Sequence, residues 1–356
     1  LAFITMTHPA EHPSFPRVFE ELSRPEGLSG ETVRRVFDAI FAGAWTPAQI
    51  GALLASQRLK GDNAECIRAA AEAMRAVMVK VEHDFPVLLD TCGTGGDGSS
   101  TLNLSTGAAL IAAAAGIAVG KHGNRAATSR SGSADVLEAL GIPLDVPAAQ
   151  QSGVLREARI AFFFATAHHP AMKHAMPVRR ELGIRTIFNC LGPLANPASA
   201  THQLLGAPDD AMRKVLAQAL AGLGTTRAWV IRSSDGMDEV SPHAPTRVTE
   251  IAGGKLTELE VAPEDFGIER SPPGAIAGGE TPQNAKILGD VLSGERHPSR
   301  DAFVLNAAAA LVVAEGLAPR AAADRAREAI ESGAARRVLE RWRDAARARR
   351  ASPGAA

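Results

Sequence analysis

The sequence predicts an α/β protein preceded by a helical segment, and three observations carry this prediction. Between Val18 and Val81 apolar residues recur at helical spacing without any strand pattern. The first strand-like run, Phe85–Asp90, then leads directly into the glycine-rich segment Gly93–Gly98. Beyond it, short apolar runs alternate with alanine-rich helical runs, which is typical of a mainly parallel sheet covered by helices on both faces.

Start signals mark the helices of the first segment. Thr46-Pro47-Ala48-Gln49 is a capping box with proline at the first helical position, and Asp62-Asn63-Ala64-Glu65 is a second candidate box. Three to four helices fit between residues 18 and 81. Since 356 residues is about twice a typical domain length, we expect two domains that meet near residue 85.

Three strand-like runs follow the glycine-rich segment: Gly116–Lys121, Ile160–Phe164 and Arg227–Ile231. The alanine-rich stretch Gly107–Val119 is 13 residues long, whereas a membrane-spanning helix takes about 20, so we expect a buried helix there. From Asp301 to Arg350 the pattern is helical again, and the arginines of the last turns suit the negative end of a helix dipole.

Charge and cysteine content limit the partners and the compartment. The 38 Lys and Arg residues nearly cancel the 39 Asp and Glu residues, so no overall field attracts nucleic acid or anionic lipid. Three cysteines are an odd number and too few for a disulfide framework, which indicates a reducing cytosol. We therefore expect a cytoplasmic protein that binds neither nucleic acid nor a membrane, and any anion site must be local.

The glycine-rich segment matches G-x-G-x-x-G, but neither common nucleotide motif fits it. A dinucleotide site needs an acidic residue roughly 20 residues later, whereas the next strand ends in Lys121-His122-Gly123-Asn124-Arg125. A P-loop needs a lysine where Ser99-Ser100 stand. The segment either admits an anion to backbone N–H groups at a helix N-terminus or simply makes a tight turn before a capped helix. On this segment alone both interpretations stand.

Lys121 and Arg125 favour the anion site, because they lie one crossover later at the carboxyl end of the neighbouring strand. Ligands bind at that edge of an open α/β sheet. Two cations and the glycine loop would then converge with four hydroxyl or amide side chains: Thr101, Asn103, Ser105 and Thr106. A molecule with phosphates at both ends would suit such a place.

Two adjacent carboxylates, Asp238 and Glu239, follow the strand Arg227–Ile231 through a loop at the same sheet edge. Adjacent carboxylates in a loop are usually just solvated. Facing a substrate with several negative charges, however, they make sense only with Mg²⁺ between them, and Mg²⁺ is commonly held by one or two carboxylates with phosphate oxygens. We therefore favour a metal site here.

The histidines and Cys92 favour structural roles. His168, His169 and His174 do not share one helical face and have no cysteine nearby, so we do not expect a zinc site. His122 is either a base or an oriented neutral donor. Cys92 abuts the glycine loop without an identifiable catalytic partner, and we interpret it as buried packing.

Five runs of residues are more specific than the glycine loop. They are Gly93-Thr94-Gly95-Gly96-Asp97, Asn103-Leu104-Ser105-Thr106, Lys121-His122-Gly123-Asn124-Arg125, Ser131–Glu138, and Arg185–Asn189 with its continuation through Leu191-Gly192-Pro193-Leu194 to Asn196-Pro197. In order and spacing they closely resemble the anthranilate phosphoribosyltransferases of the tryptophan pathway. The likeness runs from about residue 28 to about residue 345.

The resemblance implies a reaction and an architecture. The phosphoribosyl group of 5-phosphoribosyl 1-diphosphate would pass to the amine of anthranilate, with Mg²⁺ as cofactor and diphosphate as leaving group. The small helical domain would be discontinuous, with residues 1–85 joined by about 170–195, while residues 86–169 and 196–356 form the α/β domain. The family also pairs as a homodimer through the helical domain.

Site residues carry over by motif. The phosphoribosyl diphosphate site would comprise Gly93, Gly96, Asp97, Thr101, Asn103, Ser105, Thr106, Lys121 and Ser133. The metal site would comprise Ser105, Asp238 and Glu239, and anthranilate would contact Gly93, Asn124 and Arg179. Departures from the family pattern are Thr128, Gly120 and Thr166, and none removes a carried group. No residue is assigned as acid or base, because an aromatic amine is already unprotonated at neutral pH.

Two rival functions remain open to test. A pyrimidine-nucleoside-phosphorylase-like enzyme would share the architecture but use inorganic phosphate, and Asp97 with Asp238-Glu239 argues instead for a diphosphate and a metal. A non-catalytic relative that binds nucleic acid is the other rival. The near-neutral charge and the intact set of substrate residues count against it.

Overall fold

The computed structural model describes residues 12–95, 101–126, 130–272 and 274–350. These residues form two compact units. The first comprises Leu1–Met78 with His169–Leu191, and the second comprises Val79–His168 with Gly192–Ala356. The chain thus leaves the first unit at Met78, where the sequence suggested a boundary near residue 85.

The first unit is helical. Its elements are α1 (Phe15–Ser23), α2 (Gly30–Phe41), α3 (Pro47–Lys60), α4 (Ala64–Val77), the short 3₁₀ helix η1 (Pro170–His174), α9 (Met176–Leu182) and the start of α10 (Phe188–Leu194). The capping box before α3 is present, since Thr46 Oγ1 accepts from Gln49 N at 3.3 Å and the Gln49 side chain accepts from Thr46 N at 3.0 Å.

The second expected capping box is wrong by one residue. Helix α4 takes Asn63, not Asp62, as its N-cap, and the Asn63 side chain accepts from Cys66 N at 2.8 Å. Cys66 then occupies the third helical position, so no glutamate returns a bond to the cap. An aromatic cluster joins the two segments of this unit, with the Phe188 ring 5.2 Å from Phe37 and 6.3 Å from Phe41.

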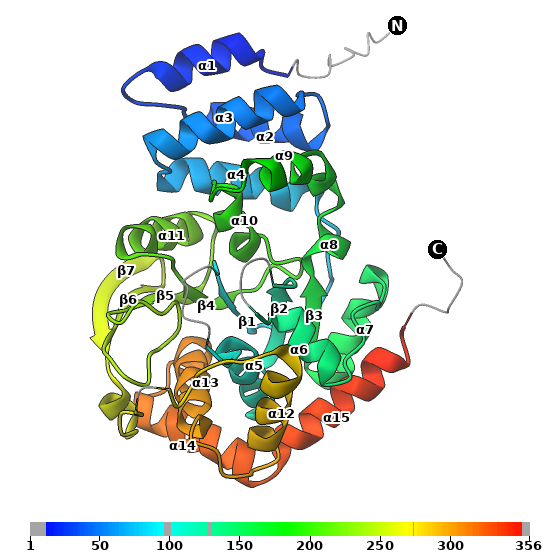
Figure 1. Cartoon of the computed structure of the whole chain (residues 1–356), viewed down its shortest axis with the longest axis vertical. Helices are drawn as coiled ribbons and strands as arrows, with labels where there is room; N and C mark the ends of the chain where they lie inside the picture. Colours follow the sequence, from blue (N-terminus) through cyan, green and yellow to red (C-terminus); the bar gives the residue numbers. More distant parts are fainter. Residues whose placement is uncertain (1–11, 96–100, 127–129, 273, 351–356) are drawn as a thin grey trace, which may run out of the picture. The chain divides into compact units, whose positions relative to one another are not determined.

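The second unit is built on one seven-stranded sheet. Its strands are β1 (Leu88–Gly93), β2 (Ala118–Gly123), β3 (Ile160–Phe164), β4 (His202–Gly206), β5 (Arg227–Ser233), β6 (Thr246–Ala252) and β7 (Lys255–Val261). Their order is β3-β2-β1-β4-β5-β6-β7, in which the first five strands are parallel to one another and β6 pairs antiparallel with both β5 and β7 (Figure 1). The predicted fold class, a helical domain with a larger and mainly parallel α/β domain, is confirmed.

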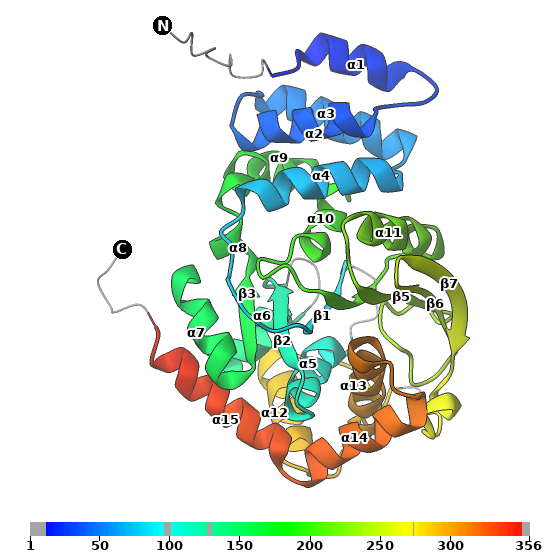
Figure 2. The same cartoon turned by 180° about the vertical axis from the view of Figure 1, so that it is seen from behind.

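Helices cover both faces of this sheet (Figures 1 and 2). They are α5 (Leu104–Ala114), α6 (Ser133–Ala139), α7 (Ala148–Ala158), α8 (Ala165–His168), α11 (Asp210–Gly222), η2 (Pro263–Phe266), α12 (Thr281–Leu292), α13 (Arg300–Glu315), α14 (Pro319–Glu331) and α15 (Ala334–Arg347). Helix α11 packs on β5 and β6, while α5 and α13 pack together on β1. The sheet order reverses at β1 and β4, and this switch point fixes where a ligand can bind.

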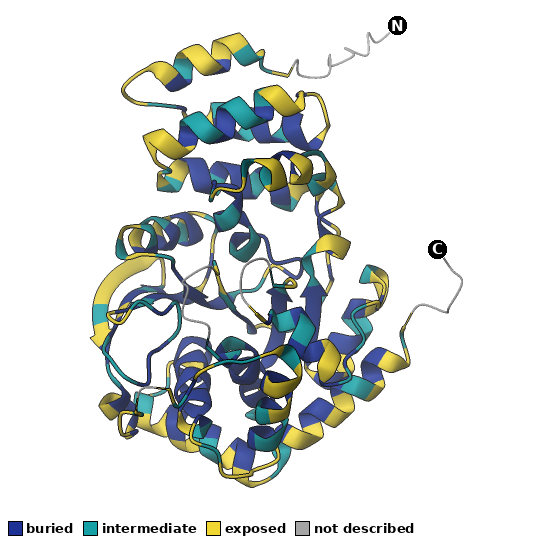
Figure 3. Cartoon of the chain, in the orientation of Figure 1, coloured by how far each residue is buried: buried dark blue, intermediate teal, exposed yellow. Residues whose placement is uncertain are grey.

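The core of the second unit centres on α13 and α5. Every residue of α13 from Ala302 to Ala314 is buried, which Figure 3 shows as a continuous dark ribbon. The two helices meet at Gly107, where a Cβ atom would lie 2.3 Å from the Phe303 ring. Glycine is therefore required for this close approach. No single helix in the described part of the chain is long and apolar enough to cross a membrane, and α13 and α14 pass that test only as a pair bent by 117°.

Candidate active site

The candidate site lies at the carboxyl ends of β1 and β4, the switch point of the sheet. Gly93 and Gly206 end these strands side by side in register. Asp238 crosses directly over both, because a Cβ atom at Gly206 would lie 1.8 Å from its backbone oxygen and one at Gly93 would lie 2.4 Å from its Oδ2. At position 206 only glycine leaves room for this loop, because the atom that a Cβ would meet there belongs to the backbone. Gly206 was not singled out from the sequence.

The two carboxylates meet the glycine loop and the start of α5. Asp238 Oδ2 accepts from Gly95 N at 3.3 Å. Glu239 Oε1 accepts from Ser105 N at 3.3 Å, and its Oε2 accepts from Thr101 Oγ1 at 3.3 Å. Residues more than 130 positions apart in sequence are thus brought to one helix N-terminus, where backbone amides and the helix dipole favour negative charge.

Lys121 approaches the same helix N-terminus from inside the sheet. Its side chain is 2% exposed, and Nζ donates to the Thr91 carbonyl and, at 3.3 Å, to Ser105 Oγ. Burial lowers the pKa of Lys121, and the nearby Asp90 carboxylate opposes that effect. The Lys121 amino group is therefore held beside the α5 N-terminus.

Asp90 and Asn196 hydrogen-bond to the backbone of the two residues that flank Lys121. Asp90 is fully buried and accepts from His122 N at 3.1 Å and from Asn196 Nδ2 at 2.8 Å, and the same Nδ2 donates to Gly120 O at 2.7 Å. Burial raises the pKa of Asp90 to about 6. The backbone on both sides of Lys121 is fixed in this way. Sequence reasoning did not select Asp90, although a carboxylate that ends an apolar strand run was a visible signal.

Other residues predicted for the phosphate site line the approach to α5. Asn103 Nδ2 donates to Ser131 O at 3.1 Å, and Asn103 Oδ1 accepts from Asn284 Nδ2 at 3.3 Å. Thr106 is buried, and its hydroxyl has no hydrogen-bond partner among the described residues. Ser133 begins α6, where its Oγ donates to Asn124 O at 3.4 Å. Gly96, Asp97 and Thr128 lie outside the described residues.

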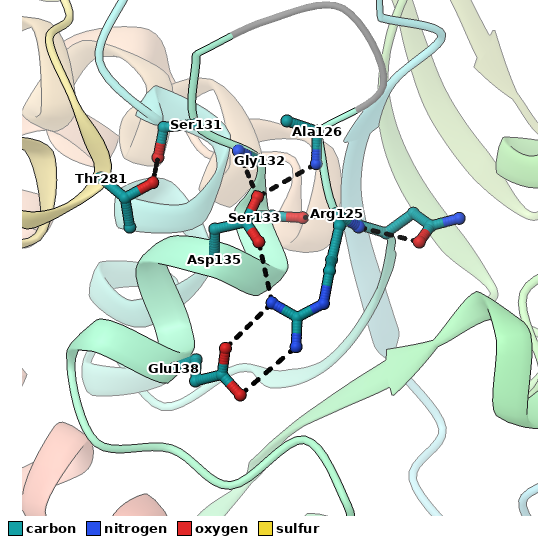
Figure 4. A network of polar contacts seen from close by, with 9 residues as sticks. Arg125, Ala126, Ser131, Gly132, Ser133, Asp135, Glu138 and Thr281 are labelled. Atoms are coloured by element: carbon teal, nitrogen blue, oxygen red, sulfur yellow. Dashed lines mark hydrogen bonds and ion pairs between the residues drawn. The ribbon is translucent and has the colours of Figure 1, made fainter.

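The prediction that Arg125 converges with Lys121 on the phosphates is wrong. Arg125 Nη1 instead pairs with Asp135 and with Glu138, each at 2.9 Å (Figure 4). Its guanidinium also lies 5.9 Å from the centre of the Phe164 ring. Asp135 and Glu138 share a face of α6 and offset the arginine's charge, so Lys121 alone of the two cations reaches the start of α5.

The histidines and Cys92 have local partners. His122 Nδ1 lies 2.8 Å from the Gly192 carbonyl, and since a carbonyl only accepts, Nδ1 carries the proton and the ring is held as an oriented donor. His168 Nδ1 makes the same kind of contact with Val79 O at 2.9 Å. Cys92 Sγ accepts from Gln203 Nε2 at 3.2 Å.

Packing explains why glycine stands at position 120, where the sequence departs from the family pattern. A Cβ atom there would lie 2.7 Å from the Phe163 ring and 3.2 Å from a Leu88 methyl group. Phenylalanine on β3 therefore fills the space that an alanine side chain would take. The substitution leaves the neighbouring Lys121 in place, because the strand register of β2 against β3 runs unbroken from Val119 to Gly123.

Arg179 lies in the first unit, on α9. Its side chain is half-buried, its guanidinium lies over the Phe188 ring at 5.2 Å, and Nη1 contacts Met176 Sδ at 3.5 Å. Burial lowers the pKa of Arg179, and no carboxylate pairs with it among the described residues. The adjacent Arg180 is exposed. Arg179 is thus a partly desolvated cation that is suited to take an anion.

Comparison with known proteins identifies the family. The glycosyl transferase family a/b domain matches residues 86–336, and the helical bundle domain of the same family matches residues 16–78. Anthranilate phosphoribosyltransferase of Symbiobacterium thermophilum is 46% identical over 328 residues, which is 92% of this chain and 96% of that protein. The same enzyme of Rubrobacter xylanophilus is 48% identical over 320 residues, or 89% and 93% of the two chains.

Solved structures agree with these sequences. The crystal structure of anthranilate phosphoribosyltransferase from Thermus thermophilus superimposes with a TM-score of 0.87 at 40% identity and covers 94% of this chain and 99% of its own. The enzyme from Saccharomyces cerevisiae in complex with PRPP and Mg gives a TM-score of 0.86 at 29% identity and covers 95% and 100%. This chain therefore belongs to the anthranilate phosphoribosyltransferase family.

Proposed function

We propose that this chain carries out the reaction of its family at the carboxyl edge of β1 and β4. It transfers the phosphoribosyl group of 5-phosphoribosyl 1-diphosphate to the amine of anthranilate, in tryptophan biosynthesis and with Mg²⁺. The observation that carries the assignment is the meeting of Lys121, Ser105 and the Asp238-Glu239 pair at the N-terminus of α5. No nucleoside phosphorylase or nucleic-acid-binding role is needed to explain these groups.

The phosphates of the donor are assigned to the α5 N-terminus and its surroundings. The glycine loop and the first turn of α5 offer backbone amides, and Lys121 supplies a fixed positive charge. Asn103, Thr101, Ser105 and Thr106 add amide and hydroxyl groups at the same place. The buried Thr106 hydroxyl fits this role because a buried polar group without a partner in the protein is poorly satisfied until a ligand binds.

The metal is assigned to Asp238 and Glu239, with Ser105 beside them. The residues fit Mg²⁺ because carboxylate and hydroxyl oxygens are its preferred ligands. The hydrogen bond from Ser105 N to Glu239 Oε1 at 3.3 Å brings Ser105 beside the two carboxylates. When bound, Mg²⁺ would offset the negative charge of the departing diphosphate. Asp238 and Glu239 would otherwise face the substrate phosphates as bare like charges.

The chemistry then needs positioning and electrostatics rather than an acid or base. Lys121 and the α5 amides hold the diphosphate where negative charge develops as the bond to the anomeric carbon breaks. We assign the anthranilate contacts to Gly93, Asn124 and Arg179. Arg179 would take the acceptor carboxylate with two parallel hydrogen bonds, leaving the amine to attack. Its lack of a carboxylate partner among the described residues supports this role.

The helical unit has large apolar side chains on its surface, which bear on the assembly of the protein. We propose a cytoplasmic homodimer that pairs through the helical unit. Large apolar side chains of that unit are open to solvent in the single chain, above all Leu59 on α3, which is 90% exposed, and Phe19 on α1, which is 41% exposed. Such side chains favour a symmetric contact between copies.

Variants of the two carboxylates test the site directly. Asp238→Asn and Glu239→Gln should each lower kcat and raise the Mg²⁺ concentration needed for half-maximal activity, because each removes a charged ligand. Circular dichroism and melting temperature should stay close to the parent protein. Unchanged Mg²⁺ dependence in both variants would overturn the metal assignment.

A further inference from the structure

Asn306 is a polar residue in the middle of the largely buried helix α13. It lies on α13, within the stretch Ala302–Ala314, where every other residue is apolar and buried. The Asn306 side chain itself is 2% exposed. Burying an amide in such surroundings is unfavourable unless its hydrogen bonds are made, so its partners indicate what the residue is for.

Two of its three hydrogen bonds go to one residue outside the helix. Asn306 Oδ1 accepts from Val240 N at 3.0 Å, and Nδ2 donates to Val240 O at 3.0 Å. The third bond, also 3.0 Å, runs from Nδ2 to Ala302 O on the preceding turn of α13. One side-chain amide therefore pairs both backbone groups of Val240, much as a neighbouring strand would.

Val240 directly follows Glu239, so this contact fixes the peptide plane that carries the Glu239 carbonyl. The same carbonyl is held from the other side by Ser233, whose Oγ donates to it at 2.5 Å. The Glu239 backbone is thus pinned between α13 and the end of β5. Its carboxylate then has a defined reach to Ser105 N and Thr101 Oγ1.

We propose that Asn306 is a positioning residue for the Asp238-Glu239 pair and sets these carboxylates for Mg²⁺. The inference rests on the proposed metal site. Asn306, Ser105, Gly206, Asp238 and Glu239 line one small pocket at the switch point of the sheet. Two adjacent carboxylates repel each other. The hydrogen bonds of Asn306 to the Val240 backbone keep both carboxylates close to the N-terminus of α5 when no cation is bound. Partners that orient metal ligands commonly affect metal affinity by about 10- to 100-fold.

The test uses the full-length protein and two variants of Asn306. Asn306→Leu keeps the branched shape and the number of side-chain heavy atoms and removes all three hydrogen bonds. Asn306→Ser is milder, because it keeps a polar group. The serine hydroxyl is nevertheless too short to reach both the N–H and the carbonyl of Val240. Leu311→Ala is the matched control, since it opens a cavity at a fully buried position of the same helix and removes none of the hydrogen bonds between Asn306 and Val240. Glu239→Gln serves as the reference for loss of a metal ligand.

Two measurements besides activity separate positioning from packing. Electron paramagnetic resonance gives the affinity for Mn²⁺ in the presence of phosphoribosyl diphosphate, and amide hydrogen exchange follows residues 233–241 in the metal-free protein. We expect both Asn306 variants to weaken Mn²⁺ binding, by about 10- to 100-fold for Asn306→Leu, and to speed exchange in that segment. Leu311→Ala should lower the melting temperature but leave Mn²⁺ affinity unchanged.

Two results would overturn the proposal. If Glu239→Gln weakens Mn²⁺ binding but the Asn306 variants bind it like the parent protein, the metal site stands and Asn306 is only a packing residue. If Glu239→Gln also binds Mn²⁺ normally, the metal assignment fails and the role of Asn306 fails with it. Should Asn306→Leu not fold, Asn306→Ser is judged by the same criterion.

Discussion

Replacing Gly206 by alanine adds one methyl group at the carboxyl end of β4, directly under the loop that carries Asp238. The new Cβ would lie 1.8 Å from the Asp238 carbonyl oxygen, whereas Cβ atoms are essentially never found closer than 3.0 Å to a neighbour. The contact must therefore open by 1.2 Å. The new Cβ atom is bonded directly to the backbone of β4, and the Asp238 oxygen belongs to the backbone of its loop. Rotation of a side chain therefore cannot relieve the contact.

The expected effect follows from that displacement. Shifting catalytic groups by about 1 Å can cost about 100-fold in rate, and we expect a loss of that order in kcat/KM for Gly206→Ala. Overpacking should lower the free energy of unfolding by about 1–3 kcal/mol. Anthranilate fluorescence gives the rate, and urea denaturation gives the stability.

Gly289→Ala is the matched control for this prediction. Gly289 lies on α12, and the nearest atom to its added Cβ is a Leu140 methyl group at an ordinary 3.7 Å. This variant should keep the parental kcat/KM. Gly206→Ala with kcat/KM within about twofold of the parent protein would refute the argument, because the loop that carries Asp238 would then tolerate a displacement of about 1 Å without loss of rate.

Three further predictions concern the acceptor, a buried carboxyl group and assembly. Arg179→Ala should weaken anthranilate use by about 1.5–3 kcal/mol and Arg179→Lys should not restore it, with little change in affinity for phosphoribosyl diphosphate; steady-state kinetics with an unchanged anthranilate KM and kcat would place the acceptor elsewhere. Asp90 has a pKa of about 6 in the folded protein against 3.8 when unperturbed, so it contributes stability below about pH 4 that is lost as pH rises through 6. Urea denaturation from pH 4 to 7 should therefore show Asp90→Asn gaining about 3 kcal/mol on the parent protein, and parallel pH profiles would contradict this. Light scattering at micromolar concentration should give the mass of a dimer, and a monomeric mass would remove the proposed pairing of helical units.

Much of the fold follows from local signals in the sequence. Thr46 and Gln49 form the expected capping box. Of the alanine-rich stretch Gly107–Val119, the part up to Ala114 folds as the predicted buried helix α5, whereas its last two residues belong to strand β2. These signals depend on neighbours in sequence, so the pattern alone contains them. The β6–β7 hairpin was not predicted, although Gly253-Gly254 between two alternating runs is a typical two-residue hairpin signal.

The site was harder to predict because its contacts join distant segments. The sequence predicted that Lys121 and Arg125 lie at the sheet edge. It could not show that Arg125 would form ion pairs with Asp135 and Glu138. The need for glycine at position 206 arises from a loop more than 30 residues later in the chain. Asn306 carried a local signal, a single amide in an apolar helix, but its partner Val240 could be found only in the folded chain.

The most direct test of phosphoribosyl transfer is to mix the folded protein with Mg²⁺, phosphoribosyl diphosphate and anthranilate and to follow anthranilate fluorescence. We expect a steady loss of fluorescence that requires all three components and stops when Mg²⁺ is removed with a chelator. A folded protein that leaves the fluorescence constant under these conditions would contradict the claim that it transfers the phosphoribosyl group to anthranilate.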